Sequence, residues 1–453
     1  MKYWKILAAL PLLAGGMFAA AVEGLDQVLP EKYFPALDQI LRSAVNQSPR
    51  MLDQALNLEI AENDRIAARA ALLPSASAFI RDYESHDRRA DLDAQGLGAT
   101  NVRKFYYDAS VVQPVFFWGE RRNVAKMGEI RQKITQGLYQ QAYQMVAQDL
   151  RSRYLGLITL KVLAERARFN QKFTHELLRV AEERLKNKVI SDLEIFPTRL
   201  NAERADIDVE RTAFDLEAYR QTIARLSGAP VPEEEAIPEA IPAVPYNPQT
   251  FDRLLADFLS QKDMPAIDAI NARRQLEVQN LDYLNQKTRL RPKFSLAAGT
   301  SQDEQNYNLG YPPYRVTSLY AGVQVSWTIF DGFASRSAVL SSLARRRQLE
   351  VDYKDLTSRL TEVARNQSRQ IYFSSRTMSI DDRFLTSNEG NVKARQDDFT
   401  RGVIPESDVS MAQLGLFDAR YTAYAARQDF LARVAEFLGT INADPVVANA
   451  PVN

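Results

Sequence analysis

The sequence predicts a mainly α fold with a smaller β portion that has the features of a transmembrane β-barrel. The first observation behind this prediction is two proline-free helical patterns of unusual length. The second is a pair of stretches before each of them in which apolar and polar residues alternate. The third is that this order of elements occurs twice along the 453 residues. The sequence therefore reads as a duplicated unit of strand, strand, long helix and second helix.

The composition excludes several classes of protein. The 57 basic and 57 acidic side chains give a net charge of zero, so there is no electrostatic case for nucleic acid as a partner. A mean hydropathy of -0.32 is too low for a protein of many membrane-spanning helices. Without cysteine there is no thiolate nucleophile and no acylated anchor, so we expect an unlipidated chain. We also expect no metal site, because His86 and His175 are far apart in the sequence. We expect no cofactor either.

The N-terminus has the pattern of a secretory signal peptide. Lys2 and Lys5 precede an apolar run at 6–17, and three alanines follow at 19–21. We assign the signal peptide to residues 1–21 and expect an exported protein. The alternative is an uncleaved anchor, although the run is shorter than the about 20 residues of a membrane-spanning helix.

Two pairs of landmarks indicate the duplication. The aromatic-glycine junctions at Gly119 and Gly332 lie 213 positions apart, and the helix breaks at Val189 and Val403 lie 214 apart. Six prolines between the halves disfavour a helix there. The resulting division is a first repeat at 22–229, a Pro-rich linker at 230–249, a second repeat at 250–441 and a C-terminal tail at 442–453.

Within the proline-free spans, apolar residues recur at intervals of three and four, which places them on one stripe of a helix. The longer helix of each half covers about 65 residues, or about 100 Å. Such a length indicates a coiled coil or an elongated bundle. The predicted helices lie at about 120–187 and 192–227 in the first repeat, and at about 334–400 and 406–438 in the second.

The stretches before the long helices have the period of a β-strand. Leu319, Val323 and Trp327 alternate with Ser318 and Gln324, and aromatic residues gather near the strand ends. Four strands cannot close a barrel of at least eight, so several copies would have to share one. The alternative is a soluble two-sheet sandwich. The predicted strands lie at about 75–84, 104–117, 293–302 and 316–330.

This order of elements resembles the outer-membrane efflux protein family, the TolC-like exit ducts of Gram-negative bacteria. The resemblance extends from about residue 37 to 441. It rests on the strand-to-helix junctions at 113–119 and 326–332, with Gly119, Asp331 and Gly332, and on the turn at 401–409. That turn is similar to the Gly-containing periplasmic tip of the family and the aspartate that follows it.

The resemblance implies a homotrimer in which each protomer gives four strands to a twelve-stranded β-barrel in the outer membrane, continuous with a long periplasmic α-helical barrel. It also implies a passive duct, not an enzyme, that works with a periplasmic adaptor and an inner-membrane pump of the resistance-nodulation-division (RND) or ABC type. The alternative is an exported periplasmic coiled-coil adaptor or scaffold without a pore. Common catalytic motifs, such as HExxH or a phosphate-binding loop, are absent from the sequence.

The helix breaks contain the candidate functional residues. Apolar side chains at such tips either pack across their own turn or, as the family implies, interlock with the adaptor. The predicted adaptor-contacting tips are Lys188, Val189, Ile190, Gly402, Val403 and Ile404, with Lys188 standing where the family has glycine.

Acidic residues follow each break. The resemblance matches Asp408 to the family's constriction aspartate, which threefold repetition would arrange as a cation-selective ring. Alternatively, these acids cap their helices, since Ser191 and Glu194 have the spacing of a capping box. The predicted gate or selectivity residues are Asp192, Glu194, Glu406 and Asp408.

Overall fold

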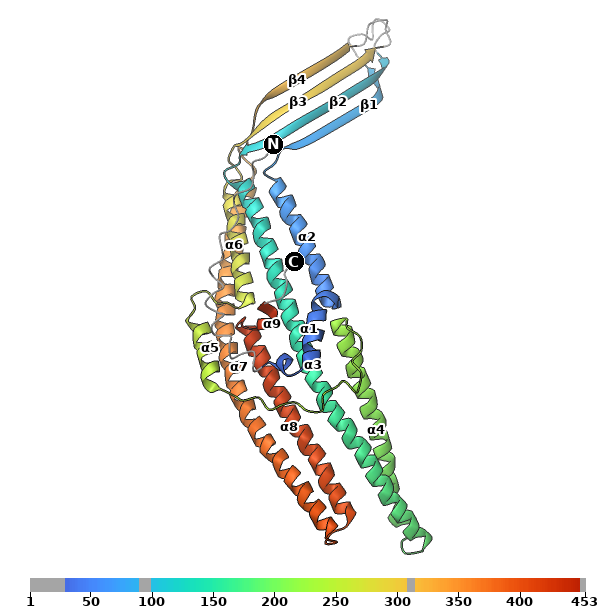
Figure 1. The fold of residues 1–453 in the computed structure, drawn as a ribbon. Helices are drawn as coiled ribbons and strands as arrows, with labels where there is room; N and C mark the ends of the chain where they lie inside the picture. The colour runs from blue at the N-terminus through green and yellow to red at the C-terminus, as the bar shows by residue number, and fades with distance from the viewer. Residues whose placement is uncertain (1–28, 89–98, 308–313, 449–453) are drawn as a thin grey trace, which may run out of the picture. The chain divides into compact units, whose positions relative to one another are not determined.

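A computed structural model describes residues 29–88, 99–307 and 314–448 (Figure 1). The predicted signal peptide at 1–21 lies outside the described residues. In chain order, the elements are η2 (Pro30–Lys32, a 3-10 helix), α1 (Pro35–Gln47), α2 (Pro49–Ala70), β1 (Ser75–Arg88), β2 (Ala99–Phe116), α3 (Glu120–Lys186), α4 (Asp192–Ser227), α5 (Pro248–Ser260), α6 (Ile267–Lys287), β3 (Lys293–Tyr307), β4 (Tyr314–Ser326), α7 (Ala334–Thr400), α8 (Glu406–Thr440) and α9 (Pro445–Ala448).

The chain forms two compact units. The helical unit comprises Met1–Leu56, Gln136–Ile270 and Asp355–Asn453, and the sheet unit comprises Asn57–Thr135 and Asn271–Lys354. Each unit takes segments from both predicted repeats. The duplication therefore describes the order of elements along the chain, not two separately folded halves, and the repeat boundaries stay a prediction.

The sheet unit contains one antiparallel sheet with its strands in chain order, β1-β2-β3-β4 (Figure 1). The register places Leu319 and Val323 of β4 on the same face as Leu296 of β3 and Val111 of β2. All four are exposed, Leu319 to 87%. On the opposite face, the hydroxyls of Ser77 and Ser110 lie 3.2 Å apart. Alternation along each strand thus gives the sheet one apolar and one polar face.

The strands differ from their predicted bounds at the ends. β4 stops at Ser326, where the sequence predicts strand up to 330, because its ladder with β3 starts at the pair Lys293–Ser326. Pro292, just before Lys293, has no N–H to extend that ladder. The indole of Trp327 instead donates to the carbonyl of Leu290, at 3.0 Å.

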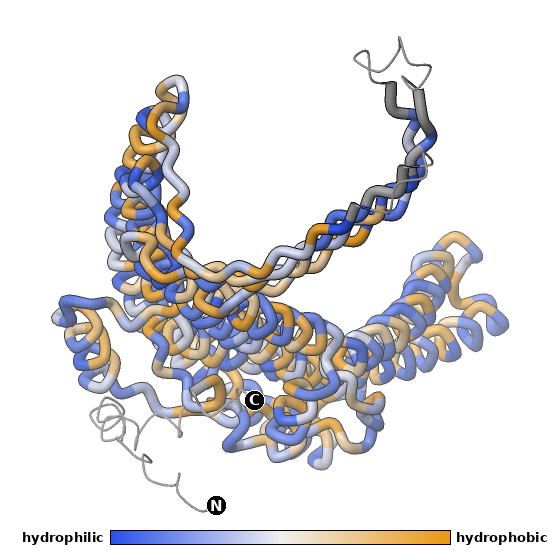
Figure 2. The backbone as a smooth tube through the Cα atoms, turned by 90° about the horizontal axis from the view of Figure 1, so that it is seen from above, coloured by the Kyte–Doolittle hydropathy of each residue, from blue (hydrophilic) through white to orange (hydrophobic). Residues whose placement is uncertain are grey.

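The long helices alternate in hydropathy along their length (Figure 2). Among the described residues, no helix combines the length and the apolarity needed to cross a membrane. Their apolar sides instead build the core of the helical unit, where Phe251 of α5 packs against Phe437 of α8 with ring centroids 6.2 Å apart. Both rings are fully buried. This amphipathic spacing is what the predicted bundle requires.

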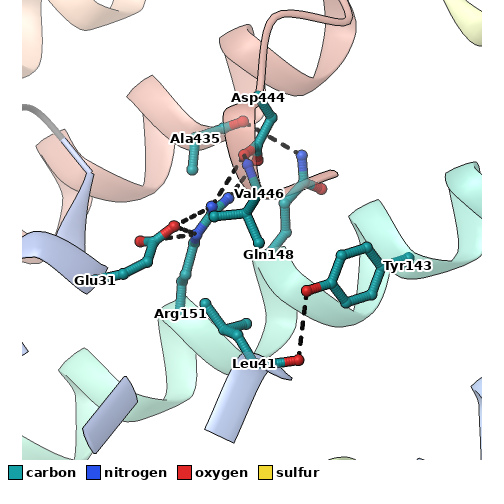
Figure 3. Close-up of polar contacts among 8 residues, drawn as sticks. All are labelled: Glu31, Leu41, Tyr143, Gln148, Arg151, Ala435, Asp444 and Val446. Atoms are coloured by element: carbon teal, nitrogen blue, oxygen red, sulfur yellow. Dashed lines mark hydrogen bonds and ion pairs between the residues drawn. The ribbon is translucent and has the colours of Figure 1, made fainter. Parts of the chain in front are cut away.

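A buried ion cluster joins three distant segments of the helical unit (Figure 3). The side chain of Arg151 in α3 is 1% exposed and donates to Glu31 of η2 and to Asp444, which lies between α8 and α9. Nε of Arg151 lies 3.0 Å from Oε1 of Glu31, and Nη1 lies 2.5 Å from Oδ2 of Asp444. Burial alone would lower the pKa of Arg151, but attraction to Asp444 and Glu31 raises it above its ordinary value.

Tyr143 of α3 makes another buried contact. The hydroxyl of Tyr143 donates to the carbonyl of Leu41 in α1, at 3.3 Å (Figure 3). Burial raises the pKa of Tyr143 to about 12, so the phenol stays protonated and remains a donor at neutral pH. Gln148 donates to the carbonyl of Ala435 in α8, at 3.5 Å. Together with Arg151, these side chains connect α3 to η2, α1, α8 and the segment that follows α8.

We predict that Arg151→Gln lowers the free energy of unfolding of the helical unit by about 3–5 kcal/mol, because it leaves two buried carboxylates without a cation. Denaturant unfolding followed by circular dichroism measures the change. Arg153→Gln is the matched control, since Arg153 pairs with Asp149 on the surface of the same helix. Its effect should stay below about 1 kcal/mol. Equal effects for the two substitutions would contradict the prediction.

Candidate functional site

The first helix break is a tight turn between α3 and α4. Lys188 has a φ of +57°, in the left-handed region. The N–H of Val189 donates to the carbonyl of Arg184 at 2.9 Å, and the N–H of Lys188 donates to that of Leu185 at 2.9 Å. These two bonds define a Schellman motif, which satisfies the free carbonyls at the end of α3.

The second break, between α7 and α8, has the same geometry. Gly402 has a φ of +72°. The N–H of Val403 donates to the carbonyl of Asp398 at 3.0 Å, and that of Gly402 donates to Phe399 at 2.8 Å. Lys188 therefore occupies the left-handed position that glycine occupies in the second turn. The departure from glycine changes the residue but not the turn.

The apolar residues of the two tips fall into two classes. Val189 and Val403 are 70% and 69% exposed, so neither packs across its own turn. Ile190 and Ile404 are half-buried. Leu193, 82% exposed, is a tip residue that the sequence reasoning missed. The signal for it was an apolar side chain directly after the acid that opens α4.

The acids of the first tip serve the start of α4. The backbone N–H and the hydroxyl of Ser191 both donate to Oε2 of Glu194, at 2.7 and 2.9 Å. Donation from this backbone N–H, and then from the hydroxyl, holds the pKa of Glu194 below its ordinary value. Asp192, in the same turn, is exposed. In this protomer the carboxylate of Glu194 belongs to a capping box.

The acids of the second tip are arranged differently. Asp408 stands at the position of α8 that Glu194 has in α4, but Pro405 precedes it as the N-cap and supplies no side-chain cap. Asp408 is half-buried and Glu406 is exposed. Within the residues that the structure describes, the carboxylate of Asp408 forms no hydrogen bond. Glu194 and Asp408 occupy corresponding positions, but only the carboxylate of Asp408 is left to bind a group outside its own turn.

The strand-to-helix junctions depend on left-handed backbone conformations. Gly119 has a φ of +86° and follows Trp118 at +54°, while Gly332 has a φ of +64° and precedes Phe333 at +68°. A Cβ at either glycine would meet no atom within 4 Å, so the requirement is conformational and not steric. Asp331 caps the next helix, because its carboxylate accepts the N–H of Ser335 at 3.0 Å.

The structure groups the predicted site residues into separate clusters. Both tips belong to the helical unit and lie at the same end of it (Figure 1), whereas the two junctions belong to the sheet unit. In the described part of the chain, no hydrogen bond or ion pair joins the two tips. Each tip thus presents its own exposed valine and its own acids.

Comparison with known proteins confirms the resemblance drawn from the sequence. The family model described as outer membrane efflux protein matches residues 40–229. No curated protein sequence matches this chain significantly.

Among solved structures, the Campylobacter jejuni CmeC outer membrane channel aligns over 90% of this chain and 85% of its own, with a TM-score of 0.68 and 12% identity. The outer membrane protein VceC of Vibrio cholerae aligns over 91% and 97%, with a TM-score of 0.64 and 14% identity. The open state of the Neisseria gonorrhoeae MtrE outer membrane channel aligns over 89% of this chain and 88% of its own, with a TM-score of 0.61 and 14% identity. At these identities the likeness establishes the fold.

Both turns should be more stable with glycine at the left-handed position. Lys188→Gly should stabilise the first turn by about 1 kcal/mol and Gly402→Ala should destabilise the second by a similar amount, because only glycine adopts a positive φ without strain. Hydrogen exchange at the amides of Val189 and Val403, the donors of each turn, measures both effects.

Gly390→Ala is the matched control for these substitutions. Gly390 lies within α7, has open space around it and lacks a positive φ, so alanine should stabilise the helix there. A stabilising Gly402→Ala would contradict the account of the second turn.

The capping box also predicts a pH dependence. Because the pKa of Glu194 is lower in the folded protein, its contribution to stability is present above the unfolded pKa of about 4.3 and is lost as pH falls through the folded value. Amides of the first turn of α4 should exchange faster over that acidic range. Glu194→Gln, which retains an acceptor, should remove this dependence. A pH response that persists in Glu194→Gln would assign it to another group.

Proposed function

We propose that this chain is the passive outer-membrane exit duct of a tripartite efflux or type I secretion system. It receives substrates from an inner-membrane pump of the RND or ABC type and a periplasmic adaptor and conducts them to the exterior. The chain is exported by the signal peptide at 1–21 and carries no lipid. The observation that carries the proposal is the four-stranded sheet with one exposed apolar face, together with the match to the outer membrane efflux protein family.

The edges of the sheet support a shared barrel. Within the described residues, β1 pairs only with β2 and β4 only with β3, so each outer strand has an unpaired edge. The strands contain 13 to 18 residues, more than the about 9–11 that a tilted strand needs to cross a bilayer. In lipid, every backbone N–H and C=O must be paired. Three copies, joined edge to edge, form a twelve-stranded β-barrel.

The two faces of the sheet give that barrel its interior and exterior. The apolar face, with Leu319 and Val323, contacts the hydrocarbon of the outer membrane. The polar face, with Ser77, Ser110 and Gln324, lines a water-filled interior. Below the membrane, the long helices of the three copies form the periplasmic α-helical barrel through which substrates enter.

The tips of the hairpins contact the adaptor. Val189, Leu193 and Val403 are apolar and strongly exposed in the protomer, which is the chemistry expected of a surface that a partner covers. Lys188 and Gly402 set the turns that present them, and the half-buried Ile190 and Ile404 complete the adaptor-contacting tips.

The entrance is lined by acids. Asp408 has no partner of its own among the described residues, so threefold repetition gives a ring of free carboxylates that attracts cations. Glu406, also in the first turn of α8, adds negative charge. On the first tip, the capping box favours a local role for Glu194 over a place in the ring.

Reconstitution tests the proposed duct directly. The purified chain, added to a planar lipid bilayer, should conduct ions without nucleotide. When cells that express the chain are fractionated, it should be recovered with the outer membrane. The alternative of a periplasmic adaptor or scaffold predicts recovery in the soluble periplasmic extract and no conductance. That result would contradict the duct.

Asp408→Asn should reduce the cation preference of the channel and weaken its block by divalent ions, because neutralising one residue per protomer removes the whole ring. Reversal potentials in a salt gradient measure the preference. Glu194→Gln serves as the control and should leave both properties nearly unchanged. If Asp408→Asn also leaves both unchanged, Asp408 does not form the filter.

A further inference from the structure

The junction between sheet and helices in the sheet unit carries a local excess of positive charge. In segments 117–122 and 288–293, which together we name the basic junction, five charged residues are basic and only Glu120 is acidic. Glu120 is already paired with Lys293, at 2.7 Å. The basic residues are Arg121, Arg122, Arg289, Arg291 and Lys293.

Two tryptophans fix the backbone of this region. The indole N–H of Trp118 donates to the carbonyl of Pro292 at 2.8 Å, and that of Trp327 donates to the carbonyl of Leu290 at 3.0 Å. Both bonds fall within the short segment that joins α6 to β3. That segment therefore has a fixed path, and Arg289 and Arg291 on it are exposed.

Aromatic rings hold the cations in place without neutralising them. The guanidinium of Arg291 lies 4.7 Å from the ring centroid of Trp118, and that of Arg121 lies 4.7 Å from the ring centroid of Phe117. A cation on an aromatic face keeps its N–H donors for another partner. Nε of Arg121 is buried and has no hydrogen-bond partner, a second sign that this cluster is incomplete in the isolated protomer.

The cations adjoin the apolar face of the sheet. The ring of Trp118 lies 4.8 Å from that of Phe116, which lies 6.3 Å from that of Phe294. Phe294 pairs with Val325, which is 53% exposed on that face. The basic junction is thus placed where the apolar surface ends, next to indoles of the kind that gather at membrane interfaces.

We propose that the basic junction binds the phosphate groups of anionic phospholipids in the membrane leaflet that faces the helices. Guanidinium groups bind phosphate through paired N–H donors, and basic residues beside a membrane-spanning segment attract anionic headgroups. This inference rests on the proposed function, since it requires the apolar face of the sheet to lie in lipid. The site holds the barrel at a fixed depth in the membrane.

Quenching of tryptophan fluorescence by brominated lipid tests the proposal. Trp118 and Trp327 lie at the basic junction, and the third tryptophan of the chain, Trp4, lies in the predicted signal peptide. The exported chain, without the signal peptide and so without Trp4, is placed in lipid discs of phosphatidylethanolamine containing either brominated phosphatidylglycerol or brominated phosphatidylcholine. Phosphatidylglycerol should quench more strongly at equal content.

Two double variants of equal charge separate a site from general attraction. Arg289→Gln with Arg291→Gln should lower the relative affinity for phosphatidylglycerol by about fivefold for each charge removed. Arg345→Gln with Arg347→Gln removes two exposed arginines from α7 and should leave that affinity unchanged. Since Arg291 contacts Trp118, Arg289→Gln alone keeps the test valid if the double variant folds poorly.

The other outcomes are distinguishable. Quenching by the two brominated lipids to the same extent, or equal losses in both double variants, would overturn the inference and leave the duct intact. Loss of the phosphatidylglycerol preference on adding inorganic phosphate at constant ionic strength would identify a free-phosphate site and overturn the lipid source. A chain that does not enter the discs at all would overturn the proposed function, and this inference with it.

Discussion

The helical unit depends on one buried charge. Arg151 lies in the middle of the long helix α3. Removing its guanidinium from water would be unfavourable without anionic partners. Those partners come from the start of the described chain, Glu31, and from its end, Asp444. An apolar core can pack in several ways, whereas this cation requires both carboxylates in one arrangement. The ion cluster therefore fixes where the segments that contain Glu31 and Asp444 attach to α3.

The two hairpins show how a duplicated turn can keep its geometry while its chemistry changes. Lys188 and Gly402 share a left-handed conformation and the same pair of backbone bonds, although only glycine adopts it without strain. The corresponding acids, Glu194 and Asp408, have diverged further. Ser191 engages Glu194 in a cap, whereas proline at the equivalent place leaves Asp408 without one. The backbone geometry is thus the same in the two hairpins, and proline at the N-cap of α8 lacks both donors, the N–H and the hydroxyl, that Ser191 gives to Glu194.

Sequence patterns predicted the features that arise from neighbouring residues. The capping box at Ser191 and the alternation in β4 are both visible within a few positions of the sequence. The ion cluster was not predicted, because Arg151 lies 120 residues from Glu31 and 293 from Asp444. The early end of β4 was missed for the same reason, since it depends on Pro292 and on the bond from Trp327 to Leu290. Interactions between distant segments leave no local pattern.

The apolar face of the sheet is bounded by charge at both ends. Near the tip of the sheet, Arg103 pairs with Asp82 at 2.7 Å and Arg315 pairs with Glu304 at 2.9 Å. At the other end lie Trp327 and the basic junction. From Thr317 to Ser326, β4 extends roughly 31 Å, which at a tilt of about 40–45° corresponds to a height of about 22–23 Å. That height is about that of the apolar band of an outer-membrane barrel. The charges therefore occur where a sheet crossing a bilayer would meet water.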